Sequence, residues 1–276
     1  MTGPEQESSS IASRLDVTVA HAARRYDYWL GGKDNFAPDR ESGDAIAAAF
    51  PTIQLAVREN RGFLRRAVTF LAGEAGIRQF LDIGTGLPTA NNTHQVAQAI
   101  APRSRVVYVD NDPLVLVHAR ALLTSSAEGA TAYVDADLRE PAKILDDPEL
   151  RRTLDFSQPV ALMLVAVMHF ILDSDDPYAI VARLVEALPP GSYLVVAQAT
   201  YDPLPPDTVA ALEAANARGN PKSRPRSRAE FARFFEGLDL VAPGIVSVAE
   251  WRAEDEPQPR PSFVDISGYA AVARLT

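Results

Sequence analysis

An apolar stretch that ends in two closely spaced glycines constrains this chain more than any other feature. The stretch runs from Phe80 to Ile83, and Gly84 and Gly86 follow it before a second helical pattern begins. Such a run is typical of a buried parallel strand that leads into a glycine-rich turn. Glycine admits positive φ angles and lets a ligand approach the backbone closely. Because ligands of open α/β sheets bind outside the carboxyl ends of the strands, we expect the binding site at this turn.

The residue types of this turn exclude two common phosphate-binding motifs. The dinucleotide fingerprint G-x-G-x-x-G needs a glycine where Thr89 stands, and no G-x-x-x-x-G-K-[ST] string occurs in the chain. Asp82 precedes the glycines instead, and its carboxylate would repel a pyrophosphate but attract an amino group. The pattern Asp82-x-Gly84-x-Gly86 resembles motif I of the class I S-adenosylmethionine methyltransferases, with Pro88 where many of them have a third glycine.

The composition excludes several classes of function. The 276 residues carry a formal net charge of -9 at pH 7, so we expect no nucleic-acid partner, which would need a basic face. The absence of cysteine rules out disulfides, thiolate zinc sites and a cysteine nucleophile. The four histidines show no metal-ligand spacing, and we expect no metal site. We find no secretory signal pattern and no apolar run of membrane-spanning length, which favours a cytoplasmic protein without membrane contact.

The helix and strand patterns predict three segments. Residues 1–13 are polar and are predicted to form a disordered tail. Residues 14–76 are predicted to form an N-terminal helical lid, and residues 77–276 a Rossmann-like domain. The expected helices of the lid run from Arg14 to Leu30, from Pro38 to Phe50 and from Ile53 to Ala72.

The strand patterns predict a sheet that is parallel except at one end. Five parallel strands are expected at 78–83, 105–110, 131–135, 159–167 and 192–199. Beyond residue 200 the alternation stops, and strands at about 240–251 and 264–275 flank a polar, proline-rich segment. Such a segment favours an antiparallel return over a parallel crossover. The predicted fold class is α/β, with five parallel strands plus an antiparallel final pair, which is the layout of the class I methyltransferases.

Two further acidic residues follow the second and third strands. Asp110 ends the second strand, 24 residues after Gly86 (110 − 86), where nucleoside-binding sheets place an acid for the ribose hydroxyls. Asp112 stands before Pro113 and is expected to cap the next helix. Asp137 alone would be interpreted as a turn residue. In the methyltransferases, however, an aspartate at this place takes the adenine amino group, and the amide of the next residue, here Leu138, lies beside the ring.

The string Tyr-Asp-Tyr-x-Leu-Gly-Gly-Lys-Asp-Asn-Phe, from Tyr26 to Phe36, contains more functional residue types than a helix end needs. The ring of Tyr28 is a candidate for attracting a sulfonium cation. Lys33, or Asn35 through its amide, is a candidate for holding the methionyl carboxylate. A lid helix packed by its aromatic residues is the plainer interpretation, and it does not exclude contact with a ligand.

Together these strings resemble a bacterial family of S-adenosylmethionine-dependent methyltransferase-like proteins. The strings are Tyr26–Phe36, Arg58-Glu59-Asn60-Arg61, Phe80–Thr89 and Val107–Pro113, and the resemblance extends from about Arg14 to the last strand. It implies that S-adenosylmethionine is the cofactor, and it leaves the methyl acceptor undefined. The cofactor-binding residues that it implies are Tyr28, Lys33, Asn35, Asp82, Gly84, Thr85, Gly86, Asp110, Asn111, Asp137, Leu138 and Ala166.

His169 is the candidate catalytic residue. It follows the fourth strand, where cofactor and acceptor meet in this fold, and a histidine there could act as a general base. A histidine that is hydrogen-bonded beside a buried strand is the plainer interpretation. Methyl transfer needs few acid–base groups, because catalysis can come mostly from holding sulfur, methyl group and acceptor in line in a dry pocket.

The sequence leaves three classes of function open. The leading hypothesis is an S-adenosylmethionine-dependent methyltransferase that acts on an unidentified small molecule by in-line transfer. The alternative is a non-catalytic protein that binds or senses S-adenosylmethionine or a nucleoside. An NAD-dependent oxidoreductase is disfavoured by Thr89 and by the antiparallel end of the sheet. The sequence does not define the oligomeric state.

Overall fold

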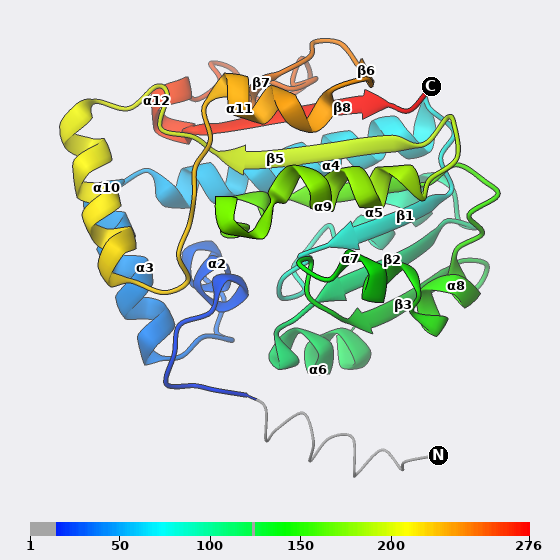
Figure 1. Ribbon diagram of the computed structural model, residues 1–276, viewed down its shortest axis with the longest axis horizontal. Coiled ribbons are helices and arrows are strands. Elements are labelled where there is room, and N and C mark those ends of the chain that lie inside the picture. The colour runs from blue at the N-terminus through cyan, green and yellow to red at the C-terminus, as the bar shows by residue number, and fades with distance from the viewer. Residues whose placement is uncertain (1–14, 123–124) are drawn as a thin grey trace.

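One mixed sheet runs through the centre of the molecule, and helices cover both of its faces (Figure 1). A computed structural model describes residues 15–122 and 125–276, with the backbone alone at 120–122. The predicted tail at 1–13 lies outside these residues. The strand order is β3-β2-β1-β4-β5-β8-β6, and β7 also pairs with β8. The parallel strands are β1 Gln79–Ile83, β2 Arg105–Asp110, β3 Ala130–Asp135, β4 Ala161–Val165 and β5 Tyr193–Ala199. The predicted α/β fold class is confirmed.

The parallel strands are apolar on both faces because a layer of helices packs on each face. All five residues of β1 are buried. Phe80 belongs to the core on one side of the sheet, and Leu81 and Ile83 belong to the core on the other. This explains why the strand is a continuous hydrophobic run in the sequence rather than an alternating one.

The two helical layers differ in their origin along the chain. One face is covered by α4 Ile53–Gly73 and α5 Thr93–Ile100, together with the buried side chain of Trp251. The other face is covered by α7 Pro141–Leu145, α8 Pro148–Thr153, α9 Pro177–Glu186 and α11 Arg228–Ala232, and α6 Pro113–Leu122 packs beside β3. No helix within the described ranges is long and apolar enough to cross a membrane.

The N-terminal helices gather at the carboxyl ends of the parallel strands. α2 Ala22–Leu30 and α3 Ala37–Ala49 pack on each other, and α10 Pro206–Arg218 packs on α3 (Figure 1). The helix predicted from Arg14 to Leu30 begins at Ala22 instead. His21 is its N-cap in an extended conformation, and the backbone N–H of His21 donates to the Asp39 carboxylate. A partner 18 residues away therefore sets the start of this helix, and the local pattern carries no sign of it.

The predicted antiparallel pair takes a different form from the one expected. The single strand predicted at 240–251 consists of β6 Asp239–Leu240 and β7 Val246–Ser247, both antiparallel to β8 Gly268–Arg274. Pro243 has no N–H to donate, and Gly244 has a φ of 83°, so the chain turns between them rather than continuing as a strand. The residues predicted to begin the last strand form α12 Phe263–Ile266. β8 itself lies antiparallel to β5, as the prediction requires.

Candidate functional site

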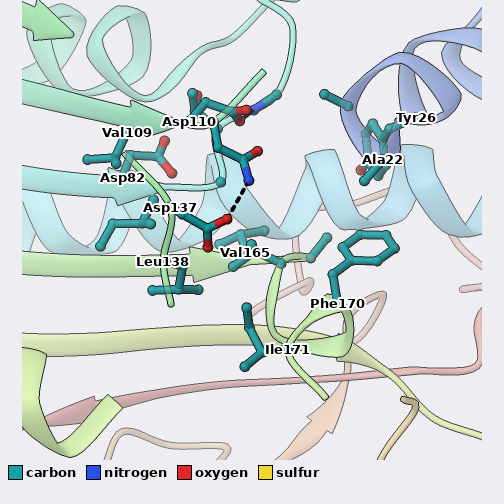
Figure 2. A pocket seen from close by; sticks show the side chains of 18 of the residues that line it. Ala22, Tyr26, Asp82, Val109, Asp110, Asp137, Leu138, Val165, Phe170 and Ile171 are labelled. Atoms are coloured by element: carbon teal, nitrogen blue, oxygen red, sulfur yellow. Dashed lines mark hydrogen bonds between the residues drawn. The ribbon is translucent and has the colours of Figure 1, made fainter. Parts of the chain in front are cut away.

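A cleft lies at the carboxyl ends of the parallel strands, where the strand order reverses between β1 and β4. Here it is termed the strand-end cleft, and it is lined by residues of β1, β2 and β4, the loops that follow β1 to β4, α2 and α4 (Figure 2). In open α/β sheets this switch point is the usual place for a ligand. The cleft encloses about 1140 Å³ of empty space, part of it open to solvent.

The glycine turn after β1 forms one wall of the cleft. Gly84 and Gly86 have φ angles of 74° and 67°, in the left-handed region that favours glycine. A Cβ atom on Gly84 would lie 2.4 Å from the side chain of Val167, so a larger residue does not fit there. The amide of Gly84 donates to the carbonyl of Val109 at 2.8 Å, and the amide of Gly86 donates to Asp110 Oδ2 at 2.8 Å. These bonds fix the turn to the end of β2.

Two buried carboxylates lie beside this turn (Figure 2). Asp110 accepts the amide of Gly86 at Oδ2 and the amide of Asp112 at Oδ1, and burial raises its pKa. Asp82 accepts the hydroxyl of Thr93 at 2.6 Å, and burial raises its pKa to about 6. Both carboxylates keep lone pairs without a protein donor. They suit a ligand that brings hydroxyl or ammonium hydrogens into the cleft.

Asp137 lies at the mouth of the cleft, beyond the end of β3. Asn111 Nδ2 donates to its Oδ2 at 2.8 Å, the bond dashed in Figure 2, and Arg139 Nη1 lies 2.9 Å from the same oxygen. The backbone N–H of Arg139 donates to Oδ1 at 2.8 Å. Asp137 is thus held in place by its neighbours, with Leu138 buried behind it.

Helix α2 closes the opposite side of the cleft. Asp112 holds the start of this helix, because its Oδ2 lies 3.0 Å from His21 Nδ1 and 3.3 Å from Arg24 Nε. Burial alone would lower the pKa of His21, but the hydrogen bond and charge of Asp112 outweigh it and raise the pKa. The Tyr26 hydroxyl donates to the Val57 carbonyl at 3.0 Å and accepts from Asn60 Nδ2 at 2.9 Å. Helix α2 is therefore tied both to the end of β2 and to α4.

The structure brings most of the predicted cofactor-binding residues together. The strand-end cleft is lined by Asp82, Gly84, Thr85, Gly86, Asp110, Asn111, Asp137, Leu138 and Ala166. Tyr28, Lys33 and Asn35 do not line it. The Tyr28 hydroxyl donates to Asp44, the Asn35 amide donates to Asp27, and Lys33 is exposed. Tyr26 faces the cleft instead of Tyr28. Side chains two positions apart on a helix point in directions that differ by roughly 200° around its axis, so only one of the two can face the cleft.

Several cleft residues were not predicted from the sequence. They include Tyr26 and Phe170, and Asn60 and Arg61 on α4. Asn60 stands in the apolar stripe of α4 between Val57 and Leu64 and is 9% exposed. A polar residue inside such a stripe is a signal that could have pointed to it. Among the residues that the structure describes, no group of three or more acidic or histidine side chains could hold a metal ion.

A second cavity adjoins the strand-end cleft. The two share Ala22, Tyr26, Asn60, Ala166 and Phe170, which line both spaces where they meet and are termed the shared wall. The second cavity encloses about 970 Å³ of empty space, again partly open. Its lining is mainly apolar and comes from α2, α3, α4, α10, the end of β5 and the chain around Ile266.

Ala166 holds a strained position in the shared wall. Its φ is 60°, in the left-handed region that costs a residue with a Cβ about 1 kcal/mol. The Ala166 amide donates to the Ala197 carbonyl at 2.9 Å, which ties the loop after β4 to β5. Strain of this kind gathers at functional sites, where the surrounding structure enforces it.

His169 lines the second cavity and not the strand-end cleft. Its Nδ1 atom is buried without a hydrogen-bond partner among the described residues. Burial, together with the charges of Arg25 and Arg226, lowers the pKa of His169 to about 3. The imidazole is therefore neutral at neutral pH and would hold a proton only weakly. Its catalytic role stays a prediction, and this environment favours hydrogen bonding over proton abstraction.

Comparison with known proteins gives the family. A family model described as S-adenosyl methyltransferase matches residues 8–276. The chain therefore belongs to the S-adenosyl methyltransferase family and is an S-adenosylmethionine-dependent methyltransferase.

Solved structures show the same relationship. A DUF574 family protein from Streptomyces avermitilis MA-4680 is 51% identical, with a TM-score of 0.90 over 95% of this chain and 100% of the other. A candidate methyltransferase from Thermobifida fusca YX is 42% identical, with a TM-score of 0.85 over 95% of this chain and 97% of the other. Human N-acetylserotonin methyltransferase in complex with S-adenosylmethionine is 14% identical, with a TM-score of 0.50 over 98% of this chain and 66% of the other, and shares the fold alone. Among curated protein sequences, none matches this chain.

Proposed function

We propose that this methyltransferase binds S-adenosylmethionine in the strand-end cleft and transfers its methyl group in line to a small molecule. The observation that carries the proposal is the buried carboxylate of Asp110, fixed at the end of β2 against the glycine turn. When bound, the cofactor supplies an electrophilic methyl group on a sulfonium sulfur. The chain's own residues then have to hold the cofactor, exclude water and align the acceptor.

Asp110 and Asp82 have complementary roles in this proposal. Each oxygen of Asp110 accepts one backbone N–H and keeps a free lone pair for a ribose hydroxyl. Asp82 is 4% exposed and is offered a single side-chain donor by Thr93, so an incoming ammonium group would stabilise its charge. Asn111, Asp137 and Leu138 lie beyond Asp110 at the mouth, where the adenine would lie.

The acceptor would approach from the second cavity. The shared wall is the one place where this cavity meets the strand-end cleft among the described residues, so the transfer would occur there. Helix α2 covers both cavities and limits the access of water to them. A cavity that is partly enclosed by helices suits a small acceptor rather than a polymer.

Calorimetric titration with S-adenosylmethionine and with S-adenosylhomocysteine tests the proposal. We expect micromolar binding of both, and a loss of about 10- to 100-fold in Asp110→Asn, because hydrogen bonds to a charged group are removed. The matched control is Asp207→Asn on the exposed first turn of α10, which should bind like the wild type. Thermal melts would confirm that each variant is folded. The proposal fails if the folded wild type binds neither compound, or if Asp110→Asn binds both as tightly as the wild type.

A further inference from the structure

Three buried nitrogen atoms around the second cavity have no hydrogen-bond partner among the described residues. They are Nε of Arg25, Nδ1 of His169 and Nε2 of Gln198, and all three residues line the cavity. Arg25 is 6% exposed and Gln198 is 3% exposed. A buried polar group without a partner costs about 1–3 kcal/mol, so three in one cavity suggest that a ligand satisfies them.

The amide of Gln198 is oriented so that it offers a donor. Arg226 Nη1 lies 3.4 Å from Gln198 Oε1, and a guanidinium can only donate. This contact places the oxygen towards Arg226 and leaves the NH₂ group free. Arg226 is itself fixed, because it donates to the carbonyls of Met168 and Ile171 at 2.9 and 2.8 Å. The Gln198 donor is therefore held in place before any ligand binds.

The charge in the lining of this cavity is positive. No acidic residue lines it, and Arg25 is the one charged lining residue among those described. Arg25 makes no ion pair within the described part of the chain, and among those residues its only side-chain hydrogen bond is the one to Ser42 Oγ at 3.1 Å. Its guanidinium lies 5.2 Å from the Trp29 ring centre and 5.8 Å from that of Phe170. Burial lowers the pKa of Arg25 to about 10, although the charge of the buried Asp39 carboxylate acts in the opposite direction, and the side chain remains a cation at neutral pH.

The rest of the cavity is mainly apolar and partly aromatic. Trp29, Phe50, Ile53, Leu204 and Leu212 line it, and Phe170 closes the side towards the strand-end cleft. The ring of Phe170 also contacts that of His169, with 4.2 Å between the ring centres. Arg25 and His169 thus lie against Phe170 of the shared wall, whereas other polar lining side chains, such as Asn216 and Ser267, already donate to backbone carbonyls.

We propose that the second cavity binds a small, mainly apolar methyl acceptor through an oxygen anion, namely a phenolate, an enolate or a carboxylate. Gln198 donates to this oxygen, His169 in its Nδ1–H form donates to it as well, and Arg25 supplies the compensating charge. Because these groups lie beside the shared wall, the bound oxygen is the atom that accepts the methyl group. This inference rests on the proposed function.

The proposed methyl transfer to the oxygen anion needs no protein side chain as a base. The acid proton of the acceptor passes to solvent when the anion binds. A lone pair of the anion then forms the new oxygen–carbon bond, while the carbon–sulfur bond breaks and its electron pair stays on sulfur. The products are a methyl ether or ester and S-adenosylhomocysteine. A neutral His169 fits this scheme, since no residue has to take up a proton.

Calorimetry on the protein saturated with S-adenosylhomocysteine tests the inference. The probes share one aromatic body: 2-naphthol, 2-naphthoate, the uncharged 2-naphthamide and the cationic 2-naphthylmethylammonium. We expect at least one of the two oxygen acids to bind about tenfold more tightly than the amide, and the ammonium to bind most weakly, because a charged hydrogen bond is gained or lost. Comparison of 2-naphthol with 2-naphthoate distinguishes a phenolate site from a carboxylate site.

Two substitutions of Gln198 and one control variant test where the probes bind. Gln198→Leu removes the donor and should weaken the better oxygen acid about tenfold. Gln198→Glu adds a negative charge and should reverse the order of the oxygen acid and the ammonium. Gln158→Glu makes the same change at an exposed position on the opposite edge of the sheet and should leave the order unchanged. All variants should bind S-adenosylhomocysteine within about twofold of the wild type, because Gln198 does not line the strand-end cleft.

The inference is overturned if the amide or the ammonium binds at least as tightly as both oxygen acids, or if the protein loaded with S-adenosylhomocysteine binds none of the four probes. It is also overturned if Gln198→Leu leaves the affinity for the oxygen acid unchanged. Failure to bind S-adenosylhomocysteine at all would instead contradict the proposed function, so the two failures can be told apart.

Discussion

The strand-end cleft and the second cavity meet at one wall but are built in different ways. The cleft takes its acids from the ends of neighbouring parallel strands, and their oxygens are partly satisfied by backbone amides of the same turns. The second cavity takes its lining from segments as far apart as Ala22 and Gly268, and its polar atoms are unpaired donors. The cleft is therefore acidic and the cavity is basic.

The two sites therefore suit ligand groups of opposite hydrogen-bonding character. The ribose and the amino group of a nucleoside cofactor present hydrogens, and acceptor oxygens recognise them. The proposed methyl acceptor presents a negative oxygen, and donors and a guanidinium recognise it. A single protein can keep both kinds of site only if the wall between them is held firmly. The loop from Ala166 to Ile171 forms much of that wall.

The largest expected effect is a loss of stability when the side chain that holds this loop is removed. Arg226→Met should destabilise the protein by about 3–5 kcal/mol, because it leaves the carbonyls of Met168 and Ile171 buried without their donor. Urea denaturation measures the change, and the exposed Arg233→Met is the control. Binding of S-adenosylhomocysteine and of 2-naphthoate should weaken together. Loss of one without the other would show that the loop does not support both sites.

A substitution in the glycine turn should affect the strand-end cleft more than the second cavity. Gly84→Ala places a Cβ 2.4 Å from Val167 on a residue with a φ of 74°, and should lower the affinity for S-adenosylhomocysteine about 100-fold. Binding of 2-naphthoate without the nucleoside should fall less, because only the displacement of Val167 in the shared loop reaches the second cavity. Gly73→Ala is the matched control, because its Cβ would meet only Ile100, at 4.0 Å. Calorimetry that finds normal nucleoside binding in Gly84→Ala would remove the turn from the site.

The converse substitution fills the second cavity. Leu212→Trp adds volume to its lining and should weaken 2-naphthoate binding about tenfold or more, while S-adenosylhomocysteine binding stays within about twofold of the wild type. Ala210→Trp, on the exposed side of the same helix, should change neither affinity. Equal losses for both ligands would contradict the assignment of separate cavities.

The smallest effect concerns the charge of Asp82. Burial raises its pKa to about 6, so it is mostly ionised at pH 7 and mostly protonated at pH 5. A protonated Asp82 cannot pair with an ammonium, and affinity for S-adenosylhomocysteine should fall about tenfold from pH 7 to pH 5. Adenosine lacks the ammonium and should show no such loss, which also controls for titration of His21. In Asp82→Asn the two compounds should have the same pH profile.

The fold and the strand-end cleft could be predicted from the sequence because their signals are local. Asp82 and Asp110 each end or follow a clear strand pattern, and the carboxyl ends of parallel strands meet at one edge. The start of α2 was mispredicted because Asp39 fixes it from 18 residues away. Tyr28 was expected where Tyr26 lies, since a helical string does not show which face meets the sheet.

The second cavity has no comparable signal in the sequence. In the sequence, Gln198 has the features of an ordinary strand residue. The orientation that leaves its side-chain NH₂ group free depends on Arg226, 28 residues further along. Arg25 stands directly before the string Tyr26–Phe36 that the sequence marks out, yet its surroundings depend on what α3, α10 and the loop after β4 place around it. Such properties emerge only when distant segments pack.

A crystal structure with S-adenosylhomocysteine and 2-naphthoate bound together tests the central claim most directly. We predict that the ribose hydroxyls contact Asp110, that the sulfur lies at the shared wall, and that the carboxylate lies within hydrogen-bond distance of Gln198 Nε2 and faces the sulfur where the two cavities meet. A nucleoside bound outside the strand-end cleft, or a carboxylate bound away from Gln198 and His169, would contradict the division of the molecule into an acidic cofactor cleft and a basic acceptor cavity.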